Sequence, residues 1–295
     1  MTVPADILKK VKRIEIDTRK MVNNIFSGEY HTQFKGQGMT FSDFREYVAG
    51  DDVRAISWAL TARAGKPYIK TYEEERELTL LLAVDVSGSQ DFGSKNYFKG
   101  ETLTYVAATM AFSAVKNNDQ VGLLLFSDEV ELYVPPKKGR AQVHRILREL
   151  LYFKPKKTGT KISSALDYLR GVLKKRATVF LLSDFRMNEA DLQFDSSLKL
   201  LERKHEIIAG VVTDQAEYLF PDVGLVELQD AETGEMIMLD TGNPIFREEM
   251  KTRFQSDFYK LQKSLGRCGV SSFQFEANDD YHKALLAFFK RKRPR

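Results

Sequence analysis

The sequence contains one cysteine and four histidines among its 295 residues. Cys268 has no second cysteine with which to form an internal disulfide, which fits a reducing compartment. The histidines lack the short, regular spacing of zinc ligands, so we expect none of them to bind a metal. They are His31, His144, His205 and His282.

Long apolar runs are also missing. The best runs, such as residues 78–84 and 121–126, are much shorter than the ~18 consecutive apolar residues of a membrane span. The first twenty residues mix acidic and basic side chains and lack the basic start and apolar stretch of a signal peptide. We therefore expect no membrane span and a cytoplasmic protein.

Several enzyme signatures are absent. The sequence has no Gly-x-x-x-x-Gly-Lys-Ser/Thr loop, so ATP hydrolysis would have to belong to a partner. It has no Gly-x-Ser-x-Gly elbow of a serine hydrolase. Haloacid-type phosphatases need a second aspartate two residues after the first, where this chain has Ser87 after Asp85.

Positive charge is concentrated at one end of the chain. The formal net charge is +4, but five of the last six residues are basic, and without them 40 basic residues face 41 acidic ones. The excess positive charge therefore lies in a C-terminal tail and does not form a basic surface across the fold, which argues against nucleic-acid binding. For this tail we favour a solvated, disordered end over a specific electrostatic contact.

The pattern of apolar residues predicts a doubly wound α/β fold with a mainly parallel sheet. Residues 5–26 have helical spacing, and residues 28–77 are punctuated by glycines and read as loops and small strands. From residue 78 onward, short apolar strands alternate with helices, as expected for a sheet covered on both faces. The expected strands are 78–84, 121–126, 130–134, 177–183, 206–213 and 270–275. The expected helices are 100–117, 140–152, 162–175, 190–204, 244–265 and 280–291.

This pattern divides the chain into three regions. Residues 1–77 form an N-terminal helix and a small β-rich region, residues 78–291 form the α/β domain, and residues 292–295 form the basic tail. Within the α/β domain, residues 223–240 contain two apolar stretches around a turn, which predicts an inserted β-hairpin.

Oxygen-bearing side chains follow three elements at the predicted carboxyl edge of the sheet. Asp85-Val86-Ser87-Gly88-Ser89 comes directly after the first strand, Asp184 follows another strand, and Thr160 precedes a helix. Ligands bind at this edge in α/β sheets. Carboxylate and hydroxyl oxygens suit Mg²⁺ or Mn²⁺, and zinc is disfavoured because cysteine and histidine are missing.

The charges of this set favour binding over catalysis. Asp85 and Asp184 only just neutralise a divalent ion, so the ion would still accept a carboxylate from a partner protein. An enzyme would also need a base or nucleophile directed at substrate, and Ser87 has no obvious base. The sequence also places no lysine or arginine next to the Asp85 loop.

The set resembles the metal-ion-dependent adhesion site of von Willebrand factor A-like domains. That pattern is Asp-x-Ser-x-Ser, then Thr, then Asp, and it falls here on Asp85, Ser87, Ser89, Thr160 and Asp184. The resemblance implies that these five residues bind the metal, Asp184 often through a water.

A second resemblance lies upstream. Five short segments are similar to the signature of a bacterial domain-of-unknown-function family, number fifty-eight, and the likeness is close over about residues 27–190. The segments are Phe44-Arg45-Glu46-Tyr47, Gly50-Asp51-Asp52-Val53-Arg54, Ile56-Ser57-Trp58, Ala62-Arg63 and Glu74-Glu75-Arg76-Glu77. Members join a small N-terminal region to a von Willebrand A-like domain and are typically encoded beside MoxR-type AAA+ ATPases. This chain has Ser57 where an aspartate is usual and Gln90 where methionine is common.

Two interpretations of the upstream signature stay open. Its charged residues pair with one another while Trp58, Tyr47 and Phe44 fill a small core, which we favour, or the segment contacts a partner directly. For the whole chain, the leading hypothesis is a non-enzymatic, metal-dependent interaction module that acts as an adaptor of a MoxR-type ATPase. The alternatives are a Mg²⁺-dependent phosphatase or phosphoryl-transfer enzyme using Asp85 and Asp184, and a purely structural protein.

Overall fold

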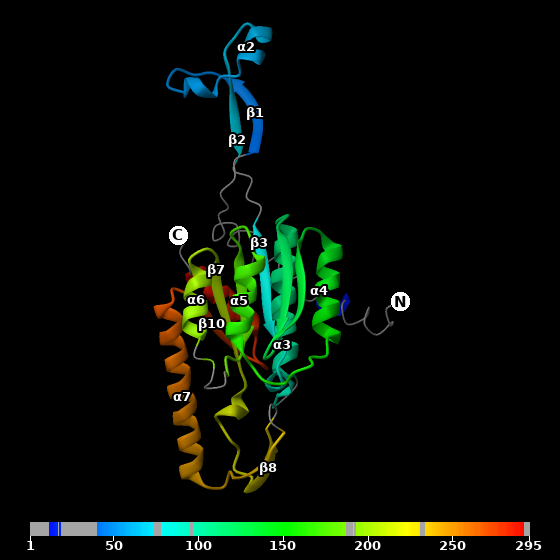
Figure 1. Ribbon diagram of the computed structural model, residues 1–295, viewed down its shortest axis with the longest axis vertical. Helices are drawn as coiled ribbons and strands as arrows, with labels where there is room; N and C mark the ends of the chain where they lie inside the picture. Colours follow the sequence, from blue (N-terminus) through cyan, green and yellow to red (C-terminus); the bar gives the residue numbers. More distant parts are fainter. Residues whose placement is uncertain are drawn as a thin grey trace. The chain divides into compact units, whose positions relative to one another are not determined.

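The computed structural model describes residues 12–16, 18, 40–73, 78–94, 97–186, 191, 193–230 and 234–291 (Figure 1). The chain forms two compact units. The smaller is Phe34–Leu78, and the larger combines Met1–Gln33 with Thr79–Arg295.

A six-stranded sheet in the order β10-β7-β6-β3-β4-β5 forms the centre of the larger unit. Five strands are parallel, and β5 pairs with β4 in the antiparallel direction at one edge. The strands are β3 (Thr79–Asp85), β4 (Gln120–Phe126), β5 (Val130–Lys137), β6 (Thr178–Ser183), β7 (Glu206–Thr213) and β10 (Ser271–Glu276). The doubly wound α/β fold expected from the sequence is confirmed.

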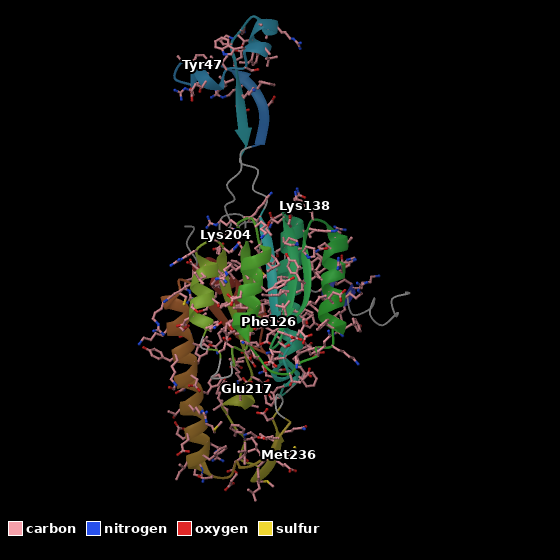
Figure 2. The ribbon with its side chains drawn as sticks, viewed as in Figure 1. Tyr47, Phe126, Lys138, Lys204, Glu217 and Met236 are labelled. Carbon is pink, nitrogen blue, oxygen red and sulfur yellow. The ribbon has the colours of Figure 1, made fainter. Side chains whose placement is uncertain are left out.

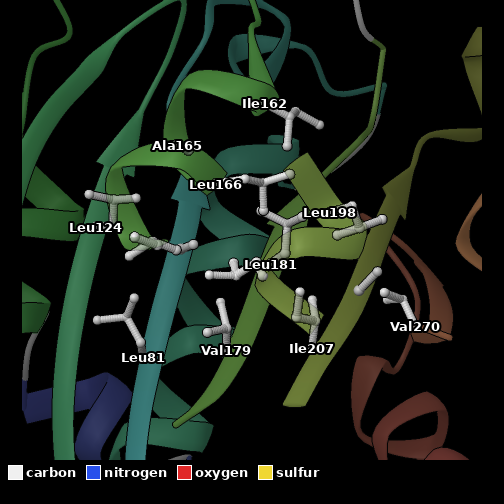
Figure 3. Packing of buried hydrophobic residues seen from close by; sticks show 14 of the residues in the cluster. Leu81, Leu124, Ile162, Ala165, Leu166, Val179, Leu181, Leu198, Ile207 and Val270 are labelled. Atoms are coloured by element: carbon white, nitrogen blue, oxygen red, sulfur yellow. The ribbon is translucent and has the colours of Figure 1, made fainter. Parts of the chain in front are cut away.

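Helices cover both faces of this sheet, which explains why the inner positions of the four central strands, β3, β4, β6 and β7, are apolar. On β6, Val179 and Leu181 belong to the buried cluster under α5 and α6 (Figure 3). Phe180 points to the other face, where its ring lies near that of Phe289 of α8. The helices are α3 (Lys99–Lys116), α4 (Arg140–Tyr152), α5 (Ile162–Val172), α6 (Phe194–Glu202), α7 (Pro244–Arg267) and α8 (Tyr281–Arg291). In the described part of the chain, no helix is long and apolar enough to cross a membrane.

The N-terminal helical residues belong with the larger unit, so grouping them with the small β-rich region was wrong. Residues 12–16 and 18 are helical, and both Ile14 and Thr18 are buried. The Glu15 carboxylate lies 3.6 Å from the His144 imidazole of α4. The helix thus contributes an apolar side chain and a polar contact to the α/β unit. The rest of the expected 5–26 helix lies outside the described residues.

The smaller unit is an antiparallel pair, β1 (Thr40–Glu46) and β2 (Tyr68–Glu73), with a 3₁₀ turn, η1 (Val53–Ala55), and a short helix, α2 (Trp58–Ala64). We did not expect α2. Three alanines and a leucine favour it, and Gly65 ends it in the left-handed conformation, at φ 72°.

The upstream signature partly follows its expected packing. The Arg45 guanidinium donates two hydrogen bonds to the Asp51 carboxylate, at 2.7 and 2.9 Å, so these two residues do pair. Asp52 instead accepts a bond from the Arg54 backbone N–H. Trp58 is 68% exposed, so the expectation that it fills a core was wrong. A two-stranded pair and a seven-residue helix have too little surface to enclose an indole.

The expected hairpin is present as β8 (Leu225–Gln229) and β9 (Met236–Asp240), which pair only with each other. It lies between β7 and α7 in the chain. Two further 3₁₀ turns follow strand ends, η2 (Gly88–Asp91) after β3 and η3 (Gln215–Glu217) after β7. Both lie at the carboxyl edge of the sheet because the strands that precede them are parallel.

Candidate metal site at the carboxyl edge of the sheet

Asp85 is the last residue of β3 and is 1% exposed. One of its carboxylate oxygens accepts a hydrogen bond from the Ser87 backbone N–H at 2.9 Å, and the other accepts one from the Ser183 hydroxyl at 2.6 Å. Ser183 ends β6, the parallel neighbour of β3. The Asp85 side chain is therefore fixed at the sheet edge from both its own loop and the next strand.

Two serine hydroxyls join the two aspartates. The Oγ atoms of Ser87 and Ser89 are 3.1 Å apart. The Ser87 hydroxyl lies near enough to Asp85 to lower the pKa of that carboxyl, and the Ser89 hydroxyl does the same for Asp184. We call Asp85, Ser87, Ser89 and Asp184 the carboxyl-edge cluster. Its oxygens come from the ends of β3 and β6, although the two aspartates are almost a hundred residues apart in the sequence.

Thr160 lies in a loop that contacts the same region. The Gly88 N–H donates to the Thr158 carbonyl at 2.8 Å, which ties the Asp85 loop to the Thr158–Thr160 segment. The Lys161 N–H donates to the carbonyl of Ser127, directly after β4. Thr160 is buried between these two bonds, just before α5 begins. Its loop therefore lies at the same sheet edge as Asp85.

Sequence analysis missed a buried lysine in this site. The Lys99 ammonium, at the first residue of α3, lies 2.5 Å from an Asp184 oxygen and 2.6 Å from a Glu217 oxygen. The Arg186 guanidinium lies 3.4 Å from the other Glu217 oxygen. The expectation of no basic side chain near the Asp85 loop was therefore wrong, because α3 brings Lys99 back to the site. A lysine in the first turn opposes the helix dipole, and that was the one signal in the sequence.

The two aspartates have opposite pKa shifts. Burial, together with the nearby Asp184 charge, raises the pKa of Asp85 to about 7. Burial also favours the neutral form of Asp184, but the charge and hydrogen bond of Lys99 outweigh it and hold the pKa of Asp184 below its usual value. Asp184 thus has a resident cation, whereas Asp85 forms no such ion pair with the described residues.

The donor set fits a hard divalent ion. The cluster offers only carboxylate and hydroxyl oxygens, the ligands that Mg²⁺ and Mn²⁺ prefer. Among the described residues, no group of three or more histidine, cysteine, aspartate and glutamate side chains could hold a metal. A site with two carboxylates and neutral hydroxyls is expected to bind such an ion weakly.

The family described as "Protein of unknown function DUF58" matches residues 43–258, which is most of the chain. The chain belongs to the DUF58 family. Uncharacterized proteins of Mycobacterium bovis and Mycobacterium tuberculosis are each 26% identical to it over 285 residues, covering 96% of this chain and 89% of theirs.

Solved structures are similar in fold. The conserved hypothetical protein BatB from Bacteroides thetaiotaomicron matches with a TM-score of 0.50 at 16% identity, over 73% of this chain and 98% of BatB. Proximal thread matrix protein 1 from the mussel byssus, with a zinc-occupied MIDAS motif, matches 47% of this chain and 38% of its own at 17% identity and a TM-score of 0.38. The BatB likeness supports the α/β fold of this DUF58 protein, and neither likeness carries information about its site.

Proposed function

We propose that this DUF58 protein is a non-enzymatic interaction module that binds Mg²⁺ or Mn²⁺ at the carboxyl-edge cluster and, through the ion, a carboxylate of a partner protein. One observation carries the proposal. Two buried aspartates from the ends of β3 and β6 lie with two serine hydroxyls, which are 3.1 Å apart, at the edge where α/β folds bind ligands.

Each residue has a role in this proposal. Asp85 and Asp184 supply the negative charge, and the hydroxyls of Ser87, Ser89 and Thr160 supply neutral oxygens. The bound ion would supply a coordination position for one more anionic oxygen.

Lys99 changes the charge balance that the sequence predicts. Asp85, Asp184, Glu217 and the buried Asp214 carry four negative charges when ionised, and Lys99 and Arg186 carry two positive ones, which leaves −2. A divalent ion would make the site neutral, whereas without Lys99 the loaded site would be −1. Lys99 thus strengthens the preference of the loaded site for an anionic partner group.

The partner we propose is a MoxR-type AAA+ ATPase or its client, with this protein as an adaptor. This part rests on the family resemblance. The chain contains no phosphate-binding loop of its own, so nucleotide hydrolysis would come from the partner.

A Mg²⁺-dependent phosphatase using Asp85 and Asp184 is the second candidate, and Lys99 is the observation in its favour, since an ammonium group can bind a phosphoryl oxygen. Against it, the Lys99 ammonium is buried and already binds two carboxylates. The Ser87 hydroxyl lies 3.1 Å from the Ser89 hydroxyl, and both oxygens of the Asp85 carboxylate accept other hydrogen bonds, so Asp85 is poorly placed to act as a base for Ser87. We therefore favour the binding role.

Partner capture from the native cell, in Mg²⁺ and in chelator, tests the proposal. Asp85→Ala should lose both metal binding and the captured chains. Asp91→Ala is the matched control, because Asp91 is an exposed aspartate of the same loop. Capture that persists in chelator and in Asp85→Ala would contradict the proposal, and Mg²⁺-dependent hydrolysis of an aryl phosphate, lost in Asp85→Ala, would establish the second candidate.

A further inference from the structure

The hairpin β8-β9 and the start of α7 expose large apolar side chains. Leu225 is 72% exposed, Met238 63% and Ile245 68%. We call the exposed apolar residues of this region the hairpin patch. Its members are Val223, Leu225, Leu228, Met236, Ile237, Met238 and Ile245. Scattered single apolar residues are ordinary on a protein surface, but a group of this size marks an interaction site.

The strand register shows that both faces of the hairpin carry such residues. Leu225, Met236 and Met238 share one face with Glu227, because cross-strand partners point the same way. The other face is aliphatic throughout, with Leu228 opposite Ile237 and Val226 opposite Leu239. An isolated two-stranded hairpin is only marginally stable in water, so a cover on its apolar side chains would stabilise it.

The hairpin is nevertheless anchored at its base. The Thr241 hydroxyl donates to the Gly224 carbonyl at 2.7 Å, and the Arg247 guanidinium of α7 donates to the Thr241 carbonyl at 2.7 Å. Just before the hairpin, the Tyr218 ring stacks on Phe254 of α7 with centroids 4.6 Å apart. The patch is thus held in place before any partner arrives, which lowers the entropic cost of binding.

The segment around the patch is strongly acidic. Residues 219–249 contain eight acidic residues and one basic residue, Arg247, a charge of −7 in a chain of +4. The remaining residues therefore carry +11. Arg247 already contacts Asp222 at 3.1 Å. Apolar side chains, two of them flexible methionines, surrounded by carboxylates complement a ligand that is apolar on one face and basic on the other.

We propose that the face of the hairpin patch that carries Leu225, Met236 and Met238 binds a basic amphipathic helix of a partner protein. The two basic segments of this chain fit less well. The N-terminal helix already buries Ile14 and Thr18 in the larger unit, and residues 290–295 contain a single apolar side chain, that of Pro294. In Figure 2, Phe126, Glu217 and Met236 succeed one another away from the carboxyl ends of the strands, so the patch extends beyond the edge that holds the candidate metal site.

A synthetic helical peptide of about 18 leucine and lysine residues tests the proposal by fluorescence anisotropy. The assay is run in chelator, so that it does not depend on metal binding. Wild-type protein and Asp85→Ala should bind the peptide equally. A peptide with glutamate in place of lysine should bind at least about tenfold more weakly, because the acidic segment repels it.

Two pairs of substitutions on the protein locate the contact. Met236→Lys/Met238→Lys should weaken binding by about tenfold or more. Tyr259→Lys/Gln262→Lys adds the same charge at exposed positions farther along α7 and should leave binding within twofold. Glu227→Lys/Glu235→Lys keeps the apolar residues and should shift the preference toward the acidic peptide.

Three results would overturn the proposal. The first is failure of the wild type to bind the basic peptide. The second is an equal loss in the α7 control pair. The third is a dimer in sedimentation experiments that Met236→Lys/Met238→Lys dissolves, which would make a second copy of this chain the occupant. Loss of metal-dependent partner capture in Asp85→Ala with unchanged peptide binding would separate this surface from the proposed metal site.

Discussion

Lys99→Met removes the ammonium that joins Asp184 to Glu217 and keeps most of the apolar stem. In chelator, the substitution leaves two buried carboxylates without their shortest ion pair. Breaking one side of a buried ion pair costs about 3–5 kcal/mol. Glu217 still has the Arg186 guanidinium at 3.4 Å in this variant. We therefore expect the lower end of that range, a loss of ~3 kcal/mol in the free energy of unfolding.

Mg²⁺ should stabilise this variant more than the wild type. A unit positive charge ~4 Å from a divalent ion costs ~8 kcal/mol at an effective dielectric constant of ~20. About a quarter of that is expected here, because the ion keeps waters that screen the ammonium. Removing Lys99 should then tighten Mg²⁺ binding by ~2 kcal/mol, about 30-fold. Because Mg²⁺ binds the folded protein, this tighter binding makes Mg²⁺ stabilise the variant more than the wild type.

Urea unfolding followed by circular dichroism, in chelator and in millimolar Mg²⁺, measures both effects. Lys263→Met, which removes an exposed lysine from α7, is the control and should change neither. Lys99→Met with wild-type stability in chelator would refute the buried ion pair. A Mg²⁺ effect no larger than that of the wild type would refute competition between Lys99 and the ion.

Three further predictions concern the fold. Burial, with the charges of Lys204 and Arg176, lowers the pKa of His205 from 6.5 to about 4. The unfolded state therefore binds more protons than the folded state between these pH values. As pH falls from 6.5 to 4, the wild type should lose stability relative to His205→Leu by at most about 1.4 kcal/mol per pH unit, measured by urea titrations across pH. Parallel stability curves for the two proteins would contradict this. Gly210→Ala should lose about 1–3 kcal/mol in urea unfolding, because its Cβ would lie 2.6 Å from the Leu182 side chain in the core, and an unchanged midpoint would show that the side chains of Leu182 and Phe273 can repack around it. Removing residues 292–295 should leave the melting temperature unchanged in calorimetry, whereas a drop of several degrees would show that the tail contributes to the fold.

The sheet could be predicted because its four central strands are continuous apolar runs, a pattern that few other structures produce. Expected strand 177–183 is β6 (Thr178–Ser183), and expected helix 140–152 is α4 (Arg140–Tyr152). Helix α2 was missed because seven residues among glycines show too little periodicity. The exposure of Trp58 was missed because the sequence does not reveal how little structure surrounds it.

The candidate site could be predicted only in part. The positions of Asp85 and Asp184 at the edge follow from strand order alone, since the ends of parallel neighbouring strands meet. Glu217 could not be assigned, because it reaches the site through its contacts with Lys99, 118 residues away in the sequence, and with Arg186. The sequence thus indicated the oxygen-bearing side chains of the cluster, but not the lysine that α3 brings to them.

Direct measurement of Mn²⁺ binding by electron paramagnetic resonance tests the central claim most directly. The full-length wild type should bind a single Mn²⁺ ion, which Mg²⁺ displaces. Asp85→Asn, which keeps the side-chain volume, should lose this binding, and Asp91→Asn should retain it. Equal Mn²⁺ binding by the wild type and Asp85→Asn, or no binding by the wild type, would contradict a divalent ion at the carboxyl-edge cluster.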